Sequence, residues 1–509
     1  MDAEKVHATL RRPHPSLAEV LEGVEVVRVT GPAHARIESI ACDSRRVESC
    51  GLFFALRGEK ADGFQFASRA IERGAVAVAS LHPRPTEISP QIAWVELPPG
   101  KDRRGLAIAS ANFYGRPADS LKLVGVTGTN GKTTTTFLID SILRAAGAST
   151  GLIGTTGYRT PKASREALNT TPESLDLQQM FAEVRDAGGT HVVLEASSHA
   201  LAMDRLWGCH FSVAVFTNLT RDHLDYHENL EDYFQAKRRL FEGTGAGAPD
   251  VAVINADDPY CDRLEGLARK TITYGLKSGA NLVGRAVSLG FSGTEFVVES
   301  PEAKLQVRSP LVGRTNVYNS LAAIGAGLSL GIRPRAIEEG IAALDLVPGR
   351  FQRVDEGQPF LVIVDYAHTD DALRNLISTA RELSPSGRII TLFGAGGERD
   401  RTKRPLMGEA AGSLSDAVVL TSDNPRSEDP LLIINDVAVG LQRVNAKYRA
   451  EPDRERALEL ALDDARAGDI VLLAGKGHET YQVLRDGKID FDDREKARAI
   501  LRRKGYSKE

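Results

Sequence analysis

One glycine-rich segment carries the residue types of a phosphate-binding loop, and it reads GTNGKTT over residues 128–134. Its members are Gly128, Thr129, Asn130, Gly131, Lys132, Thr133 and Thr134. Backbone N–H groups of such a loop, together with a helix N-terminus, favour an anion. In nucleotide-binding loops the lysine reaches the outer phosphates, and the hydroxyl that follows it holds Mg²⁺. The segment therefore predicts binding of a nucleoside triphosphate.

The segment lies between a predicted strand, residues 121–124, and a predicted helix with apolar residues at helical spacing from Phe137 to Leu143. The common P-loop pattern has a further glycine five residues before Gly131, where this chain has Val126. We interpret the segment as a shorter variant of that loop. A glycine turn without a ligand is the alternative, and neither interpretation names a reaction.

Two further predicted strands deliver polar residues where each one ends. The strand over residues 191–194 leads into Glu195, and the strand over residues 212–216 leads into a segment with His223 and His227. The carboxyl ends of parallel strands form the ligand edge of an open α/β sheet. A carboxylate at this edge, beside a phosphate-binding loop, is placed to organise Mg²⁺. For the histidines, ordinary loop positions are the alternative.

Four predicted strands in the last part of the chain end in the same way. The clusters that follow them contain Asp365, residues 394–397, residues 423–426 and residues 475–479. Helical patterns lie between these strands. This alternation predicts a second doubly wound sheet with its own ligand edge.

The alternation of strands and helices predicts an α/β protein, and 509 residues correspond to about three domains. We expect a small N-terminal α/β domain over residues 1–101, a central P-loop ATPase-like α/β domain over 102–348 and a C-terminal Rossmann-like α/β domain over 349–509. In the central domain we expect a mainly parallel sheet that is covered on both faces. Pro348-Gly349-Arg350 is a candidate hinge.

The composition is that of an ordinary globular protein, with 42% hydrophobic and 26% charged residues. The net charge is -4, whereas a nucleic-acid-binding protein is typically basic, so we expect no nucleic-acid partner. The four cysteines form no CxxC pair, so we expect reduced thiols in a cytoplasmic protein. Residues 1–7 lack the apolar core of a signal peptide, and no apolar run approaches about 18 residues, so we expect no membrane span. We also expect a monomer.

Seven short segments together resemble one family, the Mur ligases of peptidoglycan synthesis. In chain order they are GTNGKTTT, LEASSHAL, TNLTRDHLDYH, NADDP, DYAH, DNPR and GKGHE. The resemblance extends from Asp43 to Arg494, and residues 169–173 narrow it, with DNPR and GKGHE, to the branch that adds the third residue of the stem peptide. It implies an ATP-dependent ligase that adds meso-diaminopimelate to UDP-N-acetylmuramoyl-L-alanyl-D-glutamate through an acyl phosphate.

The resemblance also implies the residues of catalysis and of metal binding. Lys132 would neutralise the transferred phosphate. The ligands of two Mg²⁺ ions would be Thr133, Glu195 and His223, with Lys237 as a further ligand. Lys237 matches a lysine that carbon dioxide converts to a carbamate, N6-carboxylysine, which supplies an anionic oxygen. Without the resemblance, a lysine on a helix is more simply an exposed surface residue.

Four residues outside the glycine-rich segment match the ATP site of the family, namely Asn316, Asn319, Arg350 and Asp365. The two asparagines lie in a segment that matches the adenine side, and a helix cap is their alternative role. Arg350 and Asp365 belong to the third domain, so they would reach ATP when the domains close.

Nine residues match the site for the UDP-muramoyl-dipeptide. Those for uridine diphosphate are Ser44, Glu59, Lys60 and Ala61, and those for the muramoyl-dipeptide are Asn169, Thr170, Thr171, Ser197 and Arg205. The chain departs from relatives at Met203, where some carry glutamine, so thioether packing would replace a polar contact. It also has Asp370 where proline is more usual, which would alter the rigidity of the loop beside Asp365.

The diaminopimelate site is implied by Arg399, Asp423, Asn424, Pro425, Arg426, Gly475 and Glu479. An arginine can hold a carboxylate with two hydrogen bonds. Diaminopimelate has a distal carboxylate and lysine has none, so Arg426 favours diaminopimelate. Asp423 and Glu479 can bind the distal ammonium. A proline turn with a surface arginine is the alternative for DNPR.

Three other functions stay open. The nearest is the same ligation with L-lysine or L-ornithine, against which Arg426 argues. A nucleotide-binding regulator without catalysis would not need both the magnesium and the amino-acid residues. A folate-type polyglutamate ligase shares GTNGKT but would not need Ser44 or residues 59–61.

Overall fold

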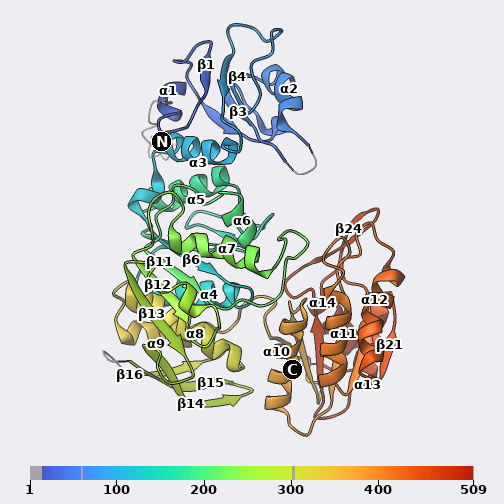
Figure 1. Ribbon diagram of the computed structural model, residues 1–509. Coiled ribbons are helices and arrows are strands. Elements are labelled where there is room, and N and C mark those ends of the chain that lie inside the picture. The colour runs from blue at the N-terminus through green and yellow to red at the C-terminus, as the bar shows by residue number, and fades with distance from the viewer. Residues whose placement is uncertain (1–13, 59–60, 301–303, 508–509) are drawn as a thin grey trace, which may run out of the picture.

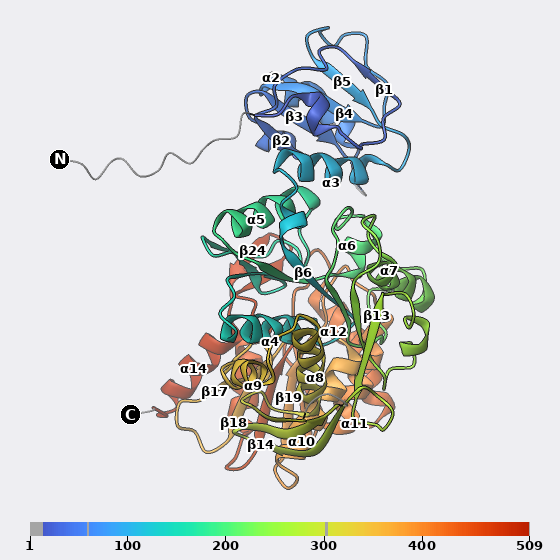
Figure 2. The same cartoon turned by 90° about the vertical axis from the view of Figure 1, so that its left-hand side faces the viewer.

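Three α/β bodies follow one another along the chain in the computed structural model, which describes residues 14–58, 61–300 and 304–507. The N-terminal body stands on the middle one, and the C-terminal body lies beside the middle one (Figure 1, Figure 2). The expected three-domain α/β architecture is therefore confirmed. Across the described ranges, no helix combines the length and the apolar character needed to cross a membrane.

The N-terminal domain is a five-stranded sheet with the order β1-β5-β4-β3-β2, parallel except for β1. Its strands are β1 (Arg28–Thr30), β2 (Ser39–Ala41), β3 (Gly51–Ala55), β4 (Ala75–Ser80) and β5 (Ala93–Glu96). The helices that pack on this sheet are α1 (Leu17–Val20), α2 (Ala67–Glu72) and α3 (Asp102–Phe113), although α3 follows the boundary expected after residue 101. The run GLFFA of β3 is apolar throughout because α1 and α3 cover one face of the sheet and α2 covers the other.

The middle domain is an eleven-stranded sheet with the order β16-β15-β14-β13-β12-β11-β6-β10-β7-β8-β9. The strands are β6 (Lys122–Thr127), β7 (Thr150–Gly154), β8 (Gly157–Arg159), β9 (Ser164–Arg165), β10 (His191–Glu195), β11 (Val213–Phe216), β12 (Val251–Asn255), β13 (Lys270–Gly275), β14 (Leu282–Gly290), β15 (Gly293–Glu299) and β16 (Lys304–Ser309). Helices α4 (Lys132–Ala145), α8 (Arg314–Ser329) and α9 (Pro334–Ala342) cover one face, and α5 (Ser174–Asp186), α6 (Ser198–Ala202) and α7 (Leu230–Glu242) cover the other.

The edges of this sheet differ from the expected alternation of strand and helix. Strands β14, β15 and β16 form an antiparallel meander, and β8 and β9 add to β7 in the same antiparallel way. Residues 304–309 of β16 alternate between exposed and buried. That alternation belongs to a strand with one solvent face, whereas the parallel centre is buried on both faces.

The C-terminal domain is a six-stranded sheet with the order β17-β18-β22-β19-β20-β21, parallel except for β17. Its strands are β17 (Gln352–Val354), β18 (Leu361–Asp365), β19 (Ile389–Phe393), β20 (Ala417–Leu420), β21 (Tyr448–Ala450) and β22 (Ile470–Ala474), with a separate hairpin of β23 (Tyr481–Leu484) and β24 (Gly487–Asp490). Helices α10 (Asp370–Leu383), α11 (Lys403–Leu414) and α12 (Pro430–Arg443) cover one face, and α13 (Arg454–Asp464) and α14 (Asp493–Arg503) cover the other.

Strand register explains why polar segments that are distant in sequence meet. Glu195 at the end of β10 pairs with Val126 of β6, and Phe216 at the end of β11 pairs with Thr127. Both strands therefore end beside the glycine-rich loop that follows β6. In the C-terminal sheet, Asp365 pairs with Ala474, so the segments after β18 and β22 also meet at one edge.

A fully buried ion pair fastens the ligand edge of the C-terminal sheet. Arg454 Nη2 lies 2.6 Å from Asp493 Oδ2, and both side chains are 0% exposed. The same guanidinium donates to Ser422 O at 3.1 Å and to Ala474 O at 3.0 Å. Arg454 therefore holds together the segments that follow β20 and β22.

Replacing Asp493 with asparagine should destabilise the C-terminal domain by about 3–5 kcal/mol, because the Arg454 charge would stay buried without its partner. The measurement is the urea midpoint of the transition that involves this domain. The matched control is Asp490→Asn, at an exposed position of β24. Equal midpoints for the two variants would contradict the expectation.

Candidate active site

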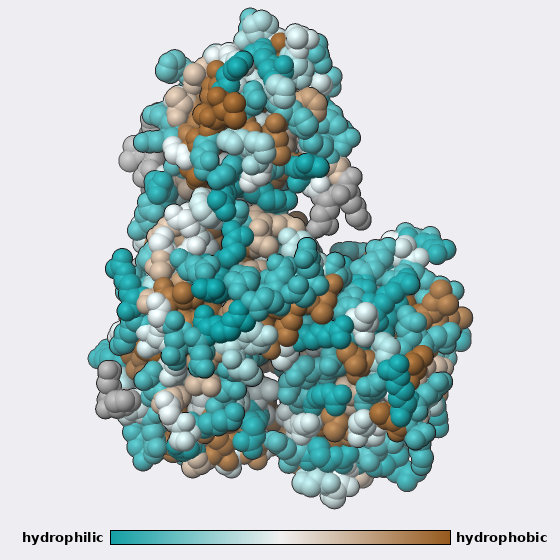
Figure 3. Space-filling view, in the orientation of Figure 1, coloured by the Kyte–Doolittle hydropathy of each residue, from teal (hydrophilic) through white to brown (hydrophobic). Residues whose placement is uncertain are grey.

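The middle and C-terminal bodies meet along a seam (Figure 3), and residues of both bodies line cavities there. Three cavities lie in this region, which we call A, B and C, with volumes of about 490, 320 and 130 Å³. Cavity C shares Thr155, Thr170 and His223 with cavity A. It shares Gly131, Thr133 and Arg350 with cavity B. Cavity C therefore lies between the other two.

Glycine is required at two positions of the loop after β6. Gly128 has a φ of 139° and Gly131 has a φ of 87°, and residues other than glycine rarely adopt such backbone angles. A Cβ at Gly128 would overlap Thr217 Oγ1, and a Cβ at Gly131 would overlap Asn319 Oδ1. Gly131 is the N-cap of α4, so the positive end of that helix dipole lies at cavities B and C.

The side-chain nitrogens of two lysines share one carbonyl of this loop. Lys132 Nζ lies 2.9 Å and Lys237 Nζ lies 2.8 Å from Gly128 O. Lys237 is 1% exposed, and its Nζ lies 4.1 Å from the centre of the Tyr233 ring. Burial and the Lys132 charge lower the pKa of Lys237 well below its ordinary value. Lys237 is thus no surface residue, and its amine is held in conditions that favour the neutral form.

Glu195, at the end of β10, and His223, in the segment after β11, both line cavity C. Glu195 accepts hydrogen bonds from Thr155 N at 2.8 Å and Thr155 Oγ1 at 3.1 Å. His223 Nε2 lies 3.4 Å from Asp222 Oδ2. Burial lowers the pKa of His223 to about 3, so its imidazole is neutral and able to bind a metal.

The donor atoms at cavity C fit Mg²⁺. Within residues 14–58, 61–300 and 304–507, no three His, Cys, Asp or Glu side chains form a metal cluster. Mg²⁺ does not need such a cluster, because it keeps several waters and binds one or two carboxylates together with substrate phosphates. Glu195, His223 and the Thr133 hydroxyl, beside a phosphate-binding loop, suit that mode.

Cavity B brings together four residues expected at a nucleotide, namely Asn316, Asn319, Arg350 and Asp365. Neither asparagine is a helix cap, because Gly313 is the N-cap of α8. Their side chains bond each other, from Asn319 Nδ2 to Asn316 Oδ1 at 2.9 Å. Asp365 accepts from Phe351 N at 2.7 Å and Ala367 N at 2.8 Å, while burial raises its pKa.

Side chains also bridge the two domains at cavity B. Arg350 Nη2 donates to Thr133 Oγ1 at 3.2 Å, and Asn130 Nδ2 donates to Asp371 Oδ2 at 2.7 Å. The glycine-rich loop and the Asp365 segment therefore face the same cavity, as expected. The two domains are therefore in contact at cavity B.

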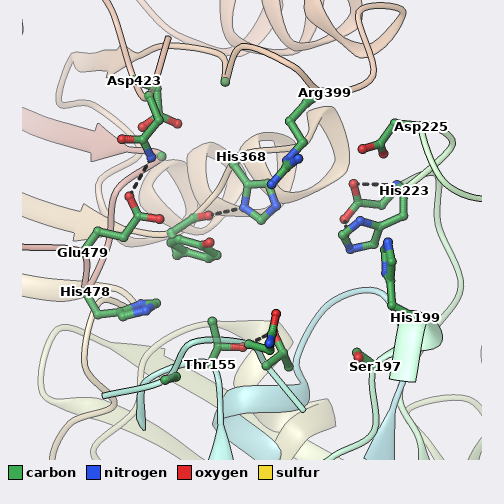
Figure 4. A pocket seen from close by; sticks show the side chains of 18 of the residues that line it. Thr155, Ser197, His199, His223, Asp225, His368, Arg399, Asp423, His478 and Glu479 are labelled. Carbon is green, nitrogen blue, oxygen red and sulfur yellow. Dashed lines mark hydrogen bonds and ion pairs between the residues drawn. The ribbon is translucent and has the colours of Figure 1, made fainter. Parts of the chain in front are cut away.

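Cavity A is walled by both domains (Figure 4). Asp423, Glu479 and Arg399 come from the C-terminal domain, and Ser197 and His199 face them from the middle domain. Six of the seven residues expected at an amino acid line it: Arg399, Asp423, Asn424, Arg426, Gly475 and Glu479. Both domains therefore contribute side chains to one cavity of about 490 Å³.

Arg426 is set in an unusual backbone conformation within cavity A. Its φ is 55°, in the left-handed region, and its N donates to Val483 O at 3.0 Å. Its Nη1 donates to Gly397 O at 2.6 Å. Burial and the nearby Arg399 charge lower the pKa of Arg426. An arginine stays protonated in proteins, so the two guanidinium groups make this wall attractive to an anion.

Four of the residues expected at the dipeptide line cavity A: Asn169, Thr170, Ser197 and Arg205. Thr171 lies behind them, buried, and its Oγ1 donates to Glu195 O at 2.6 Å. Arg205 donates to Thr171 O at 2.8 Å and to Met203 Sδ at 3.6 Å. The Met203 thioether thus packs on Arg205, and no glutamine amide is available at this position.

Besides Thr171, four described residues of the predicted site do not line the three cavities. Ser44 and Ala61 lie in the N-terminal domain. Gly128 and Pro425 take part through their backbones: Gly128 O accepts from two lysines, and the Pro425 backbone packs against Gly397. The predicted residues Glu59 and Lys60 fall outside the described residues.

The cavities also contain residues that the sequence reasoning did not assign: Thr155, His199, Tyr366, His368, Lys403, His478 and Tyr481. Four of them are within motifs already noted, SSHAL, DYAH and GKGHE, so the motifs were a signal for these four. Thr155 directly follows β7, and no sequence motif marks the end of that strand. Its role in holding Glu195 becomes visible only in the structure.

Asp370 begins α10 in place of the usual proline. Thr369 is the N-cap and accepts from Ala372 N, and an acidic residue in the first turn suits the helix dipole. Asp370 Oδ1 is buried and finds no hydrogen-bond partner among the described side chains and backbone. The helix therefore starts at this residue without a proline.

The fold and the site define a class, the three-domain α/β proteins in which a phosphate-binding loop faces a second α/β domain across a ligand cleft. Three family profiles match along the chain: "Mur ligase family, catalytic domain" over residues 36–102, "Mur ligase middle domain" over 126–327 and "Mur ligase, glutamate ligase domain" over 349–477. The chain belongs to the Mur ligase family.

Relatives agree with this assignment over nearly the full length. A protein of Solibacter usitatus is 54% identical over 494 residues, which is 96% of this chain and 99% of that protein. One of Geobacillus thermodenitrificans is 46% identical and covers 92% and 95%. Both are named UDP-N-acetylmuramoyl-L-alanyl-D-glutamate--2,6-diaminopimelate ligase. A solved structure with the same name is 34% identical, covers 97% of this chain and 99% of its own, and has a TM-score of 0.67.

Proposed function

We propose that the chain is an ATP-dependent ligase that joins meso-diaminopimelate to UDP-N-acetylmuramoyl-L-alanyl-D-glutamate, as a monomer in the cytoplasm. The names of its relatives support the reaction and its substrates. The observation that carries it is the order of the cavities. Cavity C, with Lys132, Glu195 and His223, lies between a nucleotide pocket and a pocket with two arginines.

ATP would occupy cavity B, with its triphosphate along the glycine-rich loop towards cavity C. The α4 N-terminus and Lys132 would stabilise the negative charge of the transferred phosphate. The residues that would hold Mg²⁺ are Thr133, Glu195, His223 and Lys237 as a carbamate. The bound ion would neutralise phosphate charge. Thr155 keeps Glu195 in place, and Asp222 does the same for His223.

The uridine diphosphate would lie on the N-terminal domain at Ser44, Glu59, Lys60 and Ala61. The peptide end would reach cavity A, where Asn169, Thr170, Ser197 and Arg205 would hold it. An oxygen of the D-glutamate carboxylate would attack the γ-phosphorus of ATP, and ADP would leave. Catalysis at this step is mainly positioning.

Diaminopimelate would approach the acyl phosphate from the C-terminal wall of cavity A. Its amine would attack the acyl carbon, and the tetrahedral intermediate would collapse to the amide with loss of phosphate and a proton. Arg426 and Arg399 would hold the distal carboxylate, and Asp423 and Glu479 the distal ammonium. The amide forms where both domains contribute walls, so an open cleft would not support it.

The test is phosphate release from ATP by the full-length chain with UDP-N-acetylmuramoyl-L-alanyl-D-glutamate and one amino acid at a time. We expect release with meso-diaminopimelate, far less with L-lysine or L-ornithine, and none when the nucleotide sugar is omitted. Preference for lysine or ornithine would establish the alternative substrate. Turnover with a folate in place of the nucleotide sugar would overturn the proposal.

A further inference from the structure

A buried lysine lies behind the amino-acid wall of cavity A, and the chemistry above does not use it. Lys476 follows β22 in the segment GKGHE, and its side chain is 0% exposed. It does not line the cavity. A buried ammonium is costly unless it is paired and hydrogen-bonded, so its partners reveal its role.

All three partners of this ammonium belong to the expected diaminopimelate site. Lys476 Nζ lies 3.0 Å from Asn424 Oδ1, 3.0 Å from Glu479 Oε2 and 3.5 Å from Asp423 Oδ1. Asn424 Nδ2 in turn donates to Glu479 Oε2 at 2.9 Å. Asp423 and Asn424 follow β20 while Lys476 and Glu479 follow β22, so the ammonium joins two loops that the substrate must contact.

The two carboxylates expected to bind a substrate ammonium therefore already have an internal cation. The charged side chains that line cavity A are Arg205, Arg399, Lys403 and Arg426, against Asp222, Asp225, Asp423 and Glu479, so their formal charges sum to zero. Lys476, directly behind them, raises the sum to +1.

We propose that Lys476 is a positioning residue that makes the pocket selective for an amino acid with a zwitterionic distal end. This rests on the proposed function and concerns the same site. The distal end of diaminopimelate carries an ammonium and a carboxylate and is neutral overall. The distal end of lysine carries an ammonium alone. A cavity whose charged side chains sum to +1 opposes the unaccompanied cation, whereas a zwitterion pairs with both signs of charge.

Lys476→Met keeps most of the side-chain volume and removes the charge. We expect the ratio of kcat/KM for diaminopimelate to kcat/KM for lysine to fall about tenfold or more, because lysine loses a repulsion that diaminopimelate does not feel. The change should appear mainly in KM for the amino acid, with KM for ATP little changed. Lys447→Met, at an exposed position just before β21, is the matched control and should keep the ratio.

A second pair of variants separates charge from folding. Lys476→Met alone leaves two neighbouring carboxylates, Asp423 and Glu479, without their shared cation. The double variant Lys476→Met with Glu479→Gln leaves only Asp423 in that state, so we expect it to fold even if Lys476→Met alone does not. It differs from Glu479→Gln alone by one positive charge. We expect the ratio of kcat/KM for diaminopimelate to kcat/KM for lysine to be highest for Glu479→Gln alone. The ratio should be intermediate for the double variant and lowest for Lys476→Met.

The outcomes distinguish the two proposals. A wild type that prefers lysine would overturn the proposed function and this inference with it. A wild type that prefers diaminopimelate would support the function. Suppose that Lys476→Met then lowers kcat/KM for diaminopimelate and for lysine in equal proportion, or that the double variant does so relative to Glu479→Gln. In that case Lys476 is a purely structural residue and the inference alone is wrong.

Discussion

Lys237→Ala should lose turnover by on the order of 10²–10³-fold or more, comparable with removal of a group that stabilises transition-state charge. The structure supplies the reason. Lys237 Nζ is buried at the rim of cavity C and shares Gly128 O with Lys132. An ordinary cation here would add to the Lys132 charge, whereas a carbamate would supply anionic oxygens beside Mg²⁺.

The lowered pKa of Lys237 gives this expectation a pH dependence. Carbon dioxide reacts with the neutral amine, and the reaction releases a proton. Because burial and Lys132 depress the pKa, the neutral form persists to lower pH than for an exposed lysine. Acid still protonates the amine and removes the carbamate, so activity should fall as pH falls, and added bicarbonate should oppose the loss.

The measurement is steady-state ligation by Lys237→Ala with and without short-chain carboxylic acids. The deleted side chain leaves space beside the glycine-rich loop, so acetate or propionate should restore part of the turnover. Arg238→Ala, one residue along α7, is the control and should resemble the wild type, because Arg238 pairs with Glu242 and lines none of the three cavities. Wild-type turnover by Lys237→Ala would exclude the carbamate.

The parts of the fold that could be predicted are those with local signals. The glycine-rich loop is marked by its glycines between an apolar strand and a helical pattern. Glu195, Asp365 and residues 423–426 each follow an apolar run that forms a strand. The edges of the middle sheet had weaker signals. Strands β14 to β16 alternate with one solvent face, and only pairing with distant residues shows that they extend the sheet.

The site residues that could not be predicted depend on packing between segments far apart in the chain. The letters GKGHE suit an exposed turn, yet Lys476 is buried because the loops after β20 and β22 close over it. Thr155 has no motif, and its contacts with Glu195 follow from the adjacency of β7 and β10. Only the resemblance to the Mur ligases singled out Lys237. A helical pattern does not show which side of α7 packs against the glycine-rich loop.

Arg426→Ala should raise KM for diaminopimelate far more than KM for ATP. The guanidinium lines cavity A with Arg399, while the residues expected to bind ATP line cavity B. Loss of a charge-assisted contact that leaves a carboxylate without its partner costs about 2–5 kcal/mol. At about 1.4 kcal/mol per tenfold, the loss in kcat/KM is roughly thirtyfold to several thousandfold. The use of lysine should fall much less, because lysine has no distal carboxylate.

Steady-state ligation with diaminopimelate, lysine and ornithine measures this effect for the wild type, Arg426→Ala and Arg426→Lys. Arg426→Lys should not restore full activity, because an ammonium cannot present the planar pair of donors. Arg485→Ala is the control, since Arg485 is exposed in the loop between β23 and β24 and donates to Ser427 O at 2.9 Å. If Arg426→Ala keeps the diaminopimelate preference, then DNPR is only a turn, and the charge of the wall must come from Arg399 and Lys476 instead.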